Sequence, residues 1–167
     1  MSAWQEIWNT VQSEFSDIPD VAQLTLITVR LLVAVALGGL LGWERELRGK
    51  AAGVRTHMLV AAGAALFVLI PQQAGASFAD MSRVMQGLIA GVGFLGAGAI
   101  ILGNQQVSTK GLTTAAGIWL TAAIGVAAGM GREATAVLAT FIALLIFVAV
   151  PWVARSIVGA KRENPRE

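Results

Sequence analysis

Five long and nearly uncharged apolar runs constrain the fold of this chain more than any other feature of its sequence. Most of them approach or exceed about 18 residues, the length at which an apolar helix can cross the hydrocarbon layer of a membrane. The predicted spans are residues 21–43, 56–71, 84–102, 112–128 and 134–154. Charged residues make up only 13% of the chain, whereas a soluble domain carries about 25%. We therefore expect an all-α membrane protein with five transmembrane helices.

Residues 1–20, before the first span, have the pattern of an amphipathic helix. The apolar residues that recur at helical spacing are Trp4, Ile7, Trp8, Val11, Phe15 and Ile18. This segment contains four acidic residues and no Lys or Arg. The pattern predicts a short interfacial helix lying at the membrane surface. We divide the rest of the chain into a transmembrane domain over residues 21–155 and a charged cytoplasmic tail over residues 156–167.

The basic residues predict how the spans are oriented in the membrane. Lys and Arg gather after the first span, before the fourth span and in the tail: Arg45, Arg48, Lys50, Arg55, Lys110, Arg155, Lys161, Arg162 and Arg166. With five spans, these three regions lie on the same side of the membrane. Because short loops rich in Lys and Arg stay in the cytoplasm, we expect an N-out, C-in orientation.

The densest cluster of charge lies between the first two spans and includes the single His of the chain. The candidate functional residues of this charged loop are Glu44, Arg45, Glu46, Arg48, Lys50, Arg55, Thr56 and His57. One interpretation is a solvated loop that only orients the protein. A second is an anion or lipid head-group site, because basic side chains meet the start of the second span, where Thr56 fits the N-cap. A third is a route for a cation or proton that begins at Glu44 or Glu46.

Four polar residues are predicted near the opposite side of the membrane: Arg30, Asp80, Arg83 and Gln86. Arg30 lies inside the first span, where a charge is costly in hydrocarbon. Its long side chain either reaches the outer interface or pairs with an acid inside the bundle. Asp80 is the acid expected on the same side, so we predict a buried Arg30–Asp80 pair.

Composition and motifs also limit the chemistry. There are no cysteines, which excludes disulfides and thiolate metal sites. Asp80 and Glu44 are the carboxylates considered as metal ligands, since Mg²⁺ binds one or two carboxylates and keeps several waters. We find no paired intramembrane carboxylates, no Ser with a His at the same depth and no HExxH motif. We expect no catalytic residue, no cofactor other than Mg²⁺ and no nucleic-acid partner.

Glycines mark the helix faces that we expect to pack closely. Small residues let helix backbones approach each other in lipid, where the hydrophobic effect gives little reason for helices to associate. The candidate packing residues are Gly38, Gly42, Gly87, Gly91, Gly93, Gly96 and Gly98. Five of these lie in the third span, which we predict to sit at a crowded helix contact. We also expect the chain to associate with itself through such faces, as a dimer.

Several of these segments together resemble the signature of the MgtC/SapB family. They are residues 38–46 (GGLLGWERE), 52–57 (AGVRTH), 63–67 (GAALF), 80–83 (DMSR), 91–98 (GVGFLGAG) and 111–116 (GLTTAA). The resemblance covers about residues 30–131. It implies a bacterial inner-membrane protein linked to growth in low magnesium, of the group called Mg²⁺ transporter-C.

The same resemblance implies action on other membrane proteins, since the best-known members act on partners such as the F-type ATP synthase. Those members carry a C-terminal cytoplasmic domain of the ACT type, which we expect this chain to lack. We therefore expect regulation of other membrane proteins by contact. The alternatives are a transporter or channel for Mg²⁺ or another ion, and a module that binds anions or lipid head groups.

Overall fold

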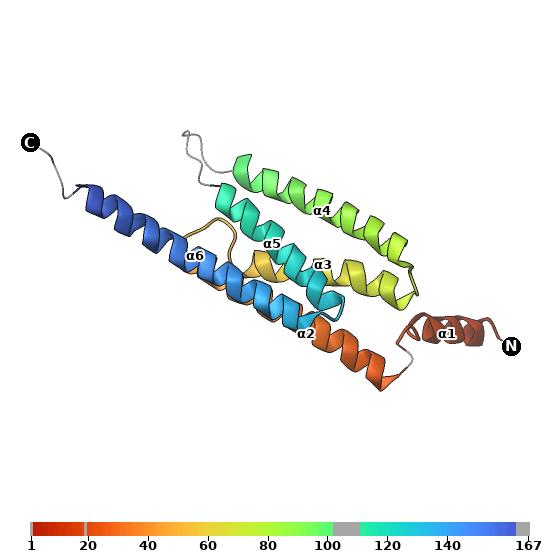
Figure 1. The fold of residues 1–167 in the computed structure, drawn as a ribbon. Helices are drawn as coiled ribbons and strands as arrows, with labels where there is room; N and C mark the ends of the chain where they lie inside the picture. The colour runs from red at the N-terminus through yellow and green to blue at the C-terminus, as the bar shows by residue number, and fades with distance from the viewer. Residues whose placement is uncertain (1, 19, 102–110, 163–167) are drawn as a thin grey trace, which may run out of the picture.

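The computed structural model describes residues 2–18, 20–101 and 111–162 of the 167-residue chain. Within these ranges it contains six helices and no strand (Figure 1). The helices are α1 (Ala3–Glu14), α2 (Val21–Leu47), α3 (Val54–Gln73), α4 (Phe78–Ile101), α5 (Leu112–Gly129) and α6 (Glu133–Arg162). Five of them, α2 to α6, are long and apolar enough to cross a membrane. The all-α architecture with five transmembrane helices is therefore confirmed.

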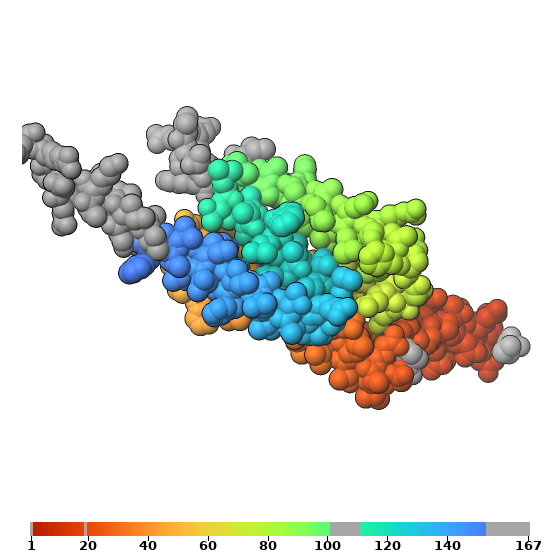
Figure 2. Space-filling model, viewed as in Figure 1, coloured from red at the N-terminus to blue at the C-terminus, as the bar shows by residue number. Residues whose placement is uncertain are grey.

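Helix α5 forms the centre of the bundle and packs against α2, α3, α4 and α6. Figure 2 shows α5 filling the space between α4 and α6 on one face of the molecule. Helix α4 lies at the edge, packed mainly on α5 and only lightly on α3. Among the described residues, α1 packs on none of the other helices and lies beside the beginning of α2 (Figure 1).

Two apolar cores hold the bundle together. The larger core joins α2, α3, α5 and α6 through Ala34, Leu37, Leu41, Ala61, Ala65, Ile124, Ala128, Ala136, Ala143 and Phe147. The smaller core lies between α3, α4 and α5 and contains Ala52, Ala64, Val92, Ile118 and Ala122. Alanine dominates both cores, which is typical of membrane helices whose backbones approach closely.

The contact between α2 and α3 explains why two glycines lie near the end of α2. A Cβ atom at Gly38 would lie 2.6 Å from the carbonyl oxygen of His57, and one at Gly42 would lie 2.6 Å from the Cα of Val54. Both positions face the backbone of α3, which cannot move aside as a flexible side chain can. These two candidate packing glycines therefore lie where α2 and α3 are in close contact.

The ends of several helices differ from the predicted spans. Helix α2 continues to Leu47, so Glu44, Arg45 and Glu46 are helical and do not belong to a loop. Helix α3 begins at Val54 with Gly53 as its N-cap, which places Arg55, Thr56 and His57 inside the helix and rules out Thr56 as the cap. The connection between them is thus only residues 48–53.

Three helices, α3, α4 and α6, extend beyond a predicted end. Helix α3 passes through Pro71 and ends at Gln73, and α4 begins at Phe78, six residues before the predicted start. Helix α6 reaches Arg162, so it includes most of the segment predicted as a tail. Lys110, used above to orient the protein, lies outside the described residues.

Candidate functional sites

A buried ionic cluster lies where α2 meets the connection to α3. Arg45, in the last turn of α2, is only 2% exposed. Its Nε lies 2.6 Å from Oε2 of Glu44, and its guanidinium carbon lies 3.9 Å from the ring centroid of Phe147 in α6. Arg48 approaches the other carboxylate oxygen, with Nε 2.7 Å from Oε1 of Glu44. We call Glu44, Arg45, Arg48 and Phe147 the ionic junction.

The ionic junction shows how a charge can be kept inside the bundle. Removing an arginine from water is costly, and its cost is offset when a carboxylate and an aromatic face replace the water. Glu44 lies between two arginines, although the approach of Arg48 to Oε1 is that of an ion pair without the alignment of a hydrogen bond. Glu44 and Arg45 are therefore part of the packed structure, and the solvated-loop interpretation does not describe them.

Glu46, in the same region, caps the start of α3. Its Oε2 accepts a hydrogen bond of 2.8 Å from the backbone N–H of Val54, at the start of α3. A Cβ atom at Gly53 would overlap the Glu46 carboxylate, so this contact depends on a glycine there. A carboxylate at a helix N-terminus is favourable because it faces the positive end of the helix dipole.

This cap weakens the case for an anion site. A cavity of about 430 Å³ opens beside it, lined by Glu46, Gly53, Val54, Arg55 and Thr56. The carboxylate already faces the N–H of Val54 and would repel an anion placed in this cavity. Arg55, Thr56 and Lys50 are exposed. Arg55 lines the same cavity and carries the opposite charge, so an anion or head-group site at the start of α3 stays a prediction.

His57 is completely buried on the face of α3 that meets α5. Its Nδ1 lies 3.0 Å from the carbonyl oxygen of Gly53, whereas its Nε2 has no hydrogen-bond partner. A Cβ atom at Gly117 in α5 would lie 3.6 Å from that Nε2, so glycine makes room for the ring. Within the described ranges, no three His, Asp or Glu side chains gather as a metal site would require. His57 thus packs between helices.

A second polar cluster surrounds Arg30, near the ends of α3 and α5 away from the ionic junction. Nη1 of Arg30 donates hydrogen bonds of 3.0 Å to Oε1 of Gln72 and to the carbonyl oxygen of Gly129. Its Nε lies 3.9 Å from Oε1 of Glu133, at the start of α6. The guanidinium also occupies the place that a side chain at Gly131 would take, and Gly131 has a φ of 74°. Arg30 therefore connects α2 to α3, α5 and α6.

Asp80 lies elsewhere, so the predicted Arg30–Asp80 pair is wrong. The Asp80 carboxylate accepts a hydrogen bond of 2.6 Å from the Ser77 hydroxyl, and its other oxygen lies 3.7 Å from Nη1 of Arg83. Both members of the Asp80–Arg83 pair are largely exposed, and Gln86 is exposed on the same helix. Asp80 caps the first turn of α4 instead of neutralising a buried arginine.

These contacts predict the outcome of a double-mutant comparison. We expect Arg30→Leu to lower the free energy of unfolding by about 2–3 kcal/mol, because charged hydrogen bonds to Gln72 and Gly129 are lost. Adding Gln72→Leu to this variant should lower it further by less than the effect of Gln72→Leu alone. Asp80→Asn should add its full effect to that of Arg30→Leu. Unfolding of the reconstituted chain in mixed detergent micelles measures all three, and coupling of Arg30 to Asp80 would contradict this arrangement.

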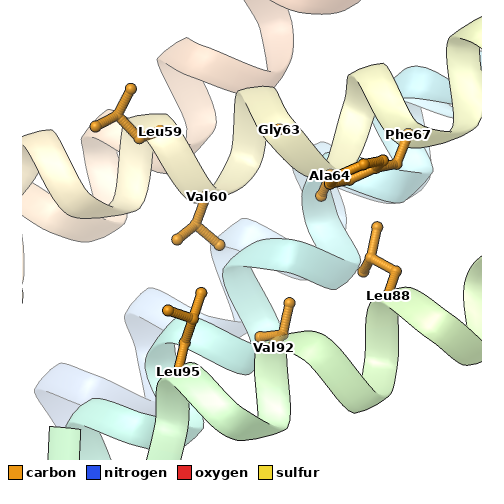
Figure 3. A pocket seen from close by; sticks show the side chains of 8 residues that line it. All are labelled: Leu59, Val60, Gly63, Ala64, Phe67, Leu88, Val92 and Leu95. Atoms are coloured by element: carbon orange, nitrogen blue, oxygen red, sulfur yellow. The ribbon is translucent and has the colours of Figure 1, made fainter. Parts of the chain in front are cut away.

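An apolar groove runs between α3 and α4 and is open to the outside of the bundle. One part, of about 290 Å³, is lined by the residues shown in Figure 3: Leu59, Val60, Gly63, Ala64, Phe67, Leu88, Val92 and Leu95. A neighbouring part, of about 400 Å³, is lined by Phe67, Val84, Gly87, Leu88, Gly91, Val92 and Leu95. We call both parts the α3–α4 groove.

Within one copy of the chain, most glycines of α4 do not make the crowded helix contact that was predicted, and contact between copies stays a prediction. A Cβ atom at Gly87, Gly91, Gly93 or Gly98 would meet no neighbouring atom of the described residues within 4 Å. Gly96 does face a neighbour among the described residues, with its Cβ position 3.5 Å from the Cβ of Ala115. Gly87 and Gly91 instead form part of the wall of the α3–α4 groove.

The close contact between α5 and α3 involves residues that the sequence analysis missed. Gly117, Thr121, Gly125 and Gly129 are all buried on one face of α5. A Cβ atom at Gly125 would overlap the backbone of Ala61, and one at Gly129 would lie 2.6 Å from the carbonyl oxygen of Ala65. The four-residue spacing of these small residues was the available signal, since it places them on one helix face.

Comparison with known proteins assigns most of the chain to one group. Residues 31–156 match the model of the MgtC family. SrpB of Synechococcus elongatus is 46% identical over 132 residues, covering 71% of each chain. "Putative magnesium transporter YhiD" of Escherichia coli K12 is 41% identical over 125 residues, and Protein MgtC of Salmonella typhimurium LT2 is 41% identical over 116 residues.

The extent of these matches differs between the relatives. The alignments cover 71% and 70% of this chain but only 57% of YhiD and 48% of MgtC, so this chain corresponds to about half of each of those two proteins. No solved structure matches the chain. The family model covers α3, α4 and α5 completely and most of α2 and α6, and both polar clusters and the α3–α4 groove fall within it or at its edge. The chain is a multi-pass membrane protein and belongs to the MgtC family.

Proposed function

We propose that this chain is a bacterial inner-membrane protein that supports growth at limiting magnesium by contact with another membrane protein. The observation that carries the proposal is the α3–α4 groove. It lies between two candidate membrane spans, is almost entirely apolar, and contains glycines with open space in front of them. A transmembrane helix of a partner needs such small residues to bring its backbone close.

The arrangement of charge supports contact over transport. Arg45 and Arg30 lie in two separate clusters, and each is paired with residues of this chain. Between the two clusters, α5 is pressed onto α3 by Gly125 and Gly129, where no side chain fits between the backbones. An ion crossing the bundle would have to displace this apolar contact and pass two arginines, which repel a cation.

Filling the groove tests the proposal in cells. We expect Gly91→Leu to abolish growth at limiting magnesium in a host that depends on this protein, because the leucine side chain occupies the place of the partner. Gly93→Leu is the matched control, since Gly93 lies in the same helix with open space around it but outside the groove. Membrane abundance and melting temperature should be equal for the two variants. Equal growth of both variants at limiting magnesium would contradict contact through this groove.

Transport of Mg²⁺ is the second candidate function, because one relative is named "Putative magnesium transporter YhiD". Liposomes that contain only this protein and a Mg²⁺-sensitive dye distinguish the two functions. We expect no Mg²⁺ entry above that of protein-free liposomes, at either sign of an imposed membrane potential. Entry that depends on the protein would overturn the proposal of action by contact and favour transport.

A further inference from the structure

Helix α1 carries an apolar face that the rest of the described chain leaves uncovered. All of its residues from Ala3 to Glu14 are exposed, and it packs on no other helix. The face consists of Trp4, Ile7, Trp8, Val11 and Phe15, which are 45–82% exposed. At 3.6 residues per turn these side chains lie within an arc of about 100°, while Asn9 and Ser13 point the opposite way. An isolated helix shorter than about 12–15 residues is only marginally stable in water, so this face needs a cover.

The apolar face of α1 continues into the membrane-facing surface of α2. Ile18, Val21 and Leu24 follow it along the chain and are 37%, 77% and 48% exposed. Helix α2 begins at Val21, where Asp20 caps it by accepting a 2.7 Å hydrogen bond from the N–H of Gln23. The connection over residues 15–20 can extend to no more than about 20 Å. Helix α1 is thus held next to the point where the first span enters the bilayer.

The charge of residues 1–20 determines which lipid head groups this helix favours. Residues 1–20 contain Glu6, Glu14, Asp17 and Asp20 and no Lys or Arg. Anionic lipids attract basic helices and repel acidic ones, within the screening distance set by salt. Indole rings, by contrast, favour the boundary between acyl chains and head groups whatever the charge of the lipid.

We propose that α1 lies in the bilayer interface with Trp4, Trp8 and Val11 facing the acyl chains, and that it prefers zwitterionic to anionic head groups. A second copy of the chain or a partner protein would need to cover the same face. Neither offers the continuity with the lipid-facing side of α2 that the bilayer does. The proposal concerns α1 alone and does not depend on the function assigned to the α3–α4 groove.

The chain contains no cysteine, so single introduced cysteines can be spin-labelled without removing any native one. The full-length variants Val11→Cys, on the apolar face, and Asn9→Cys, on the polar face, are reconstituted in phosphatidylcholine vesicles. Power saturation then measures collisions of each label with oxygen, which enriches in the membrane, and with a water-soluble nickel chelate. Phe141→Cys in α6, where the side chain is 63% exposed, serves as the membrane-spanning reference.

We expect the ratio of oxygen to nickel collisions to be several-fold higher for Val11→Cys than for Asn9→Cys and to approach that of Phe141→Cys. Equal ratios at the two α1 positions would overturn the proposal, because the helix would then be in water. Protection of the Val11→Cys label from both reagents would overturn it too, because protein would cover the face. In vesicles rich in phosphatidylglycerol the Val11→Cys ratio should fall at low salt and recover at high salt. An unchanged or higher ratio there would overturn the head-group preference.

Discussion

Replacing Arg45 with methionine is expected to lower the free energy of unfolding by about 3 kcal/mol. The change leaves the Glu44 carboxylate, whose side chain is 12% exposed, without the closer of its two arginines. Removing one member of a buried pair typically costs about 3–5 kcal/mol, and Arg48 keeps the effect near the lower end. Loss of the stacking on Phe147 contributes to the same effect. Unfolding in mixed detergent micelles, followed by circular dichroism, measures the change.

Two further variants show whether the charge or the packing is responsible. The double variant Arg45→Met with Glu44→Gln should recover part of the lost stability, because the unpaired buried charge is then absent. Arg45→Lys should remain destabilised, since an ammonium cannot contact the carboxylate and stack flat on the ring at once. Arg55→Met is the matched control: Arg55 is exposed, and its loss should change stability by less than about 0.5 kcal/mol. A loss for Arg45→Met as small as that for Arg55→Met would contradict a structural role of the ionic junction.

The five membrane helices could be predicted because hydropathy is a local property. Each span is recognisable from its own apolar residues, without knowledge of its neighbours. The ends of these helices could not be predicted in the same way, for a physical reason. Glu44 and Arg45 were assigned to a loop because charges are costly in hydrocarbon, but α2 continues through them to Leu47. The side chain that makes this possible, Phe147, lies about a hundred positions away in the sequence, and its contact with Arg45 depends on how α2 and α6 pack.

Arg30 shows the same limit at the other polar cluster. Its approximate depth and its need for polar partners could be inferred from its place in an apolar run. Which partners it finds depends on the direction in which α2 faces. The bundle places Gln72, Gly129 and Glu133 around it, whereas Asp80 lies in α4, which does not pack on α2. A backbone carbonyl such as that of Gly129 cannot be recognised as a partner from a sequence at all.

The glycines show that the number of glycines in a helix and the closeness of its contact with a neighbour are different properties. Helix α4 is rich in glycine, but most of its glycines face open space. Helix α5 has fewer, and all of them are buried on one side of the helix, where Gly125 and Gly129 face the backbone of α3. Close contact therefore depends on spacing more than on number. Gly87 and Gly91, which are open and line the α3–α4 groove, are the ones for which contact with a partner, as proposed above, offers an explanation.

The contrast between open and closed glycines leads to the second large effect. We expect Gly125→Ala to lower the free energy of unfolding by about 3 kcal/mol, at the upper end of the usual cost of overpacking. The added methyl group would overlap the carbonyl group and Cα of Ala61, which belong to the backbone of α3. Relief requires the two helices to separate, and this also disturbs Gly129 and Ala65 one turn further along.

Gly63→Ala, in α3, is the control that should not destabilise the bundle. A Cβ atom at Gly63 meets no neighbour within 4 Å in the described part of the chain, so the methyl group fits there without displacing any of these residues. Alanine favours a helix over glycine by up to about 1 kcal/mol, so this variant should be as stable as the parent chain or slightly more stable. The two substitutions are chemically identical and both lie in membrane spans, which removes the effect of composition. If they changed the unfolding free energy by the same amount and in the same direction, α5 and α3 could not be in the close backbone contact described here.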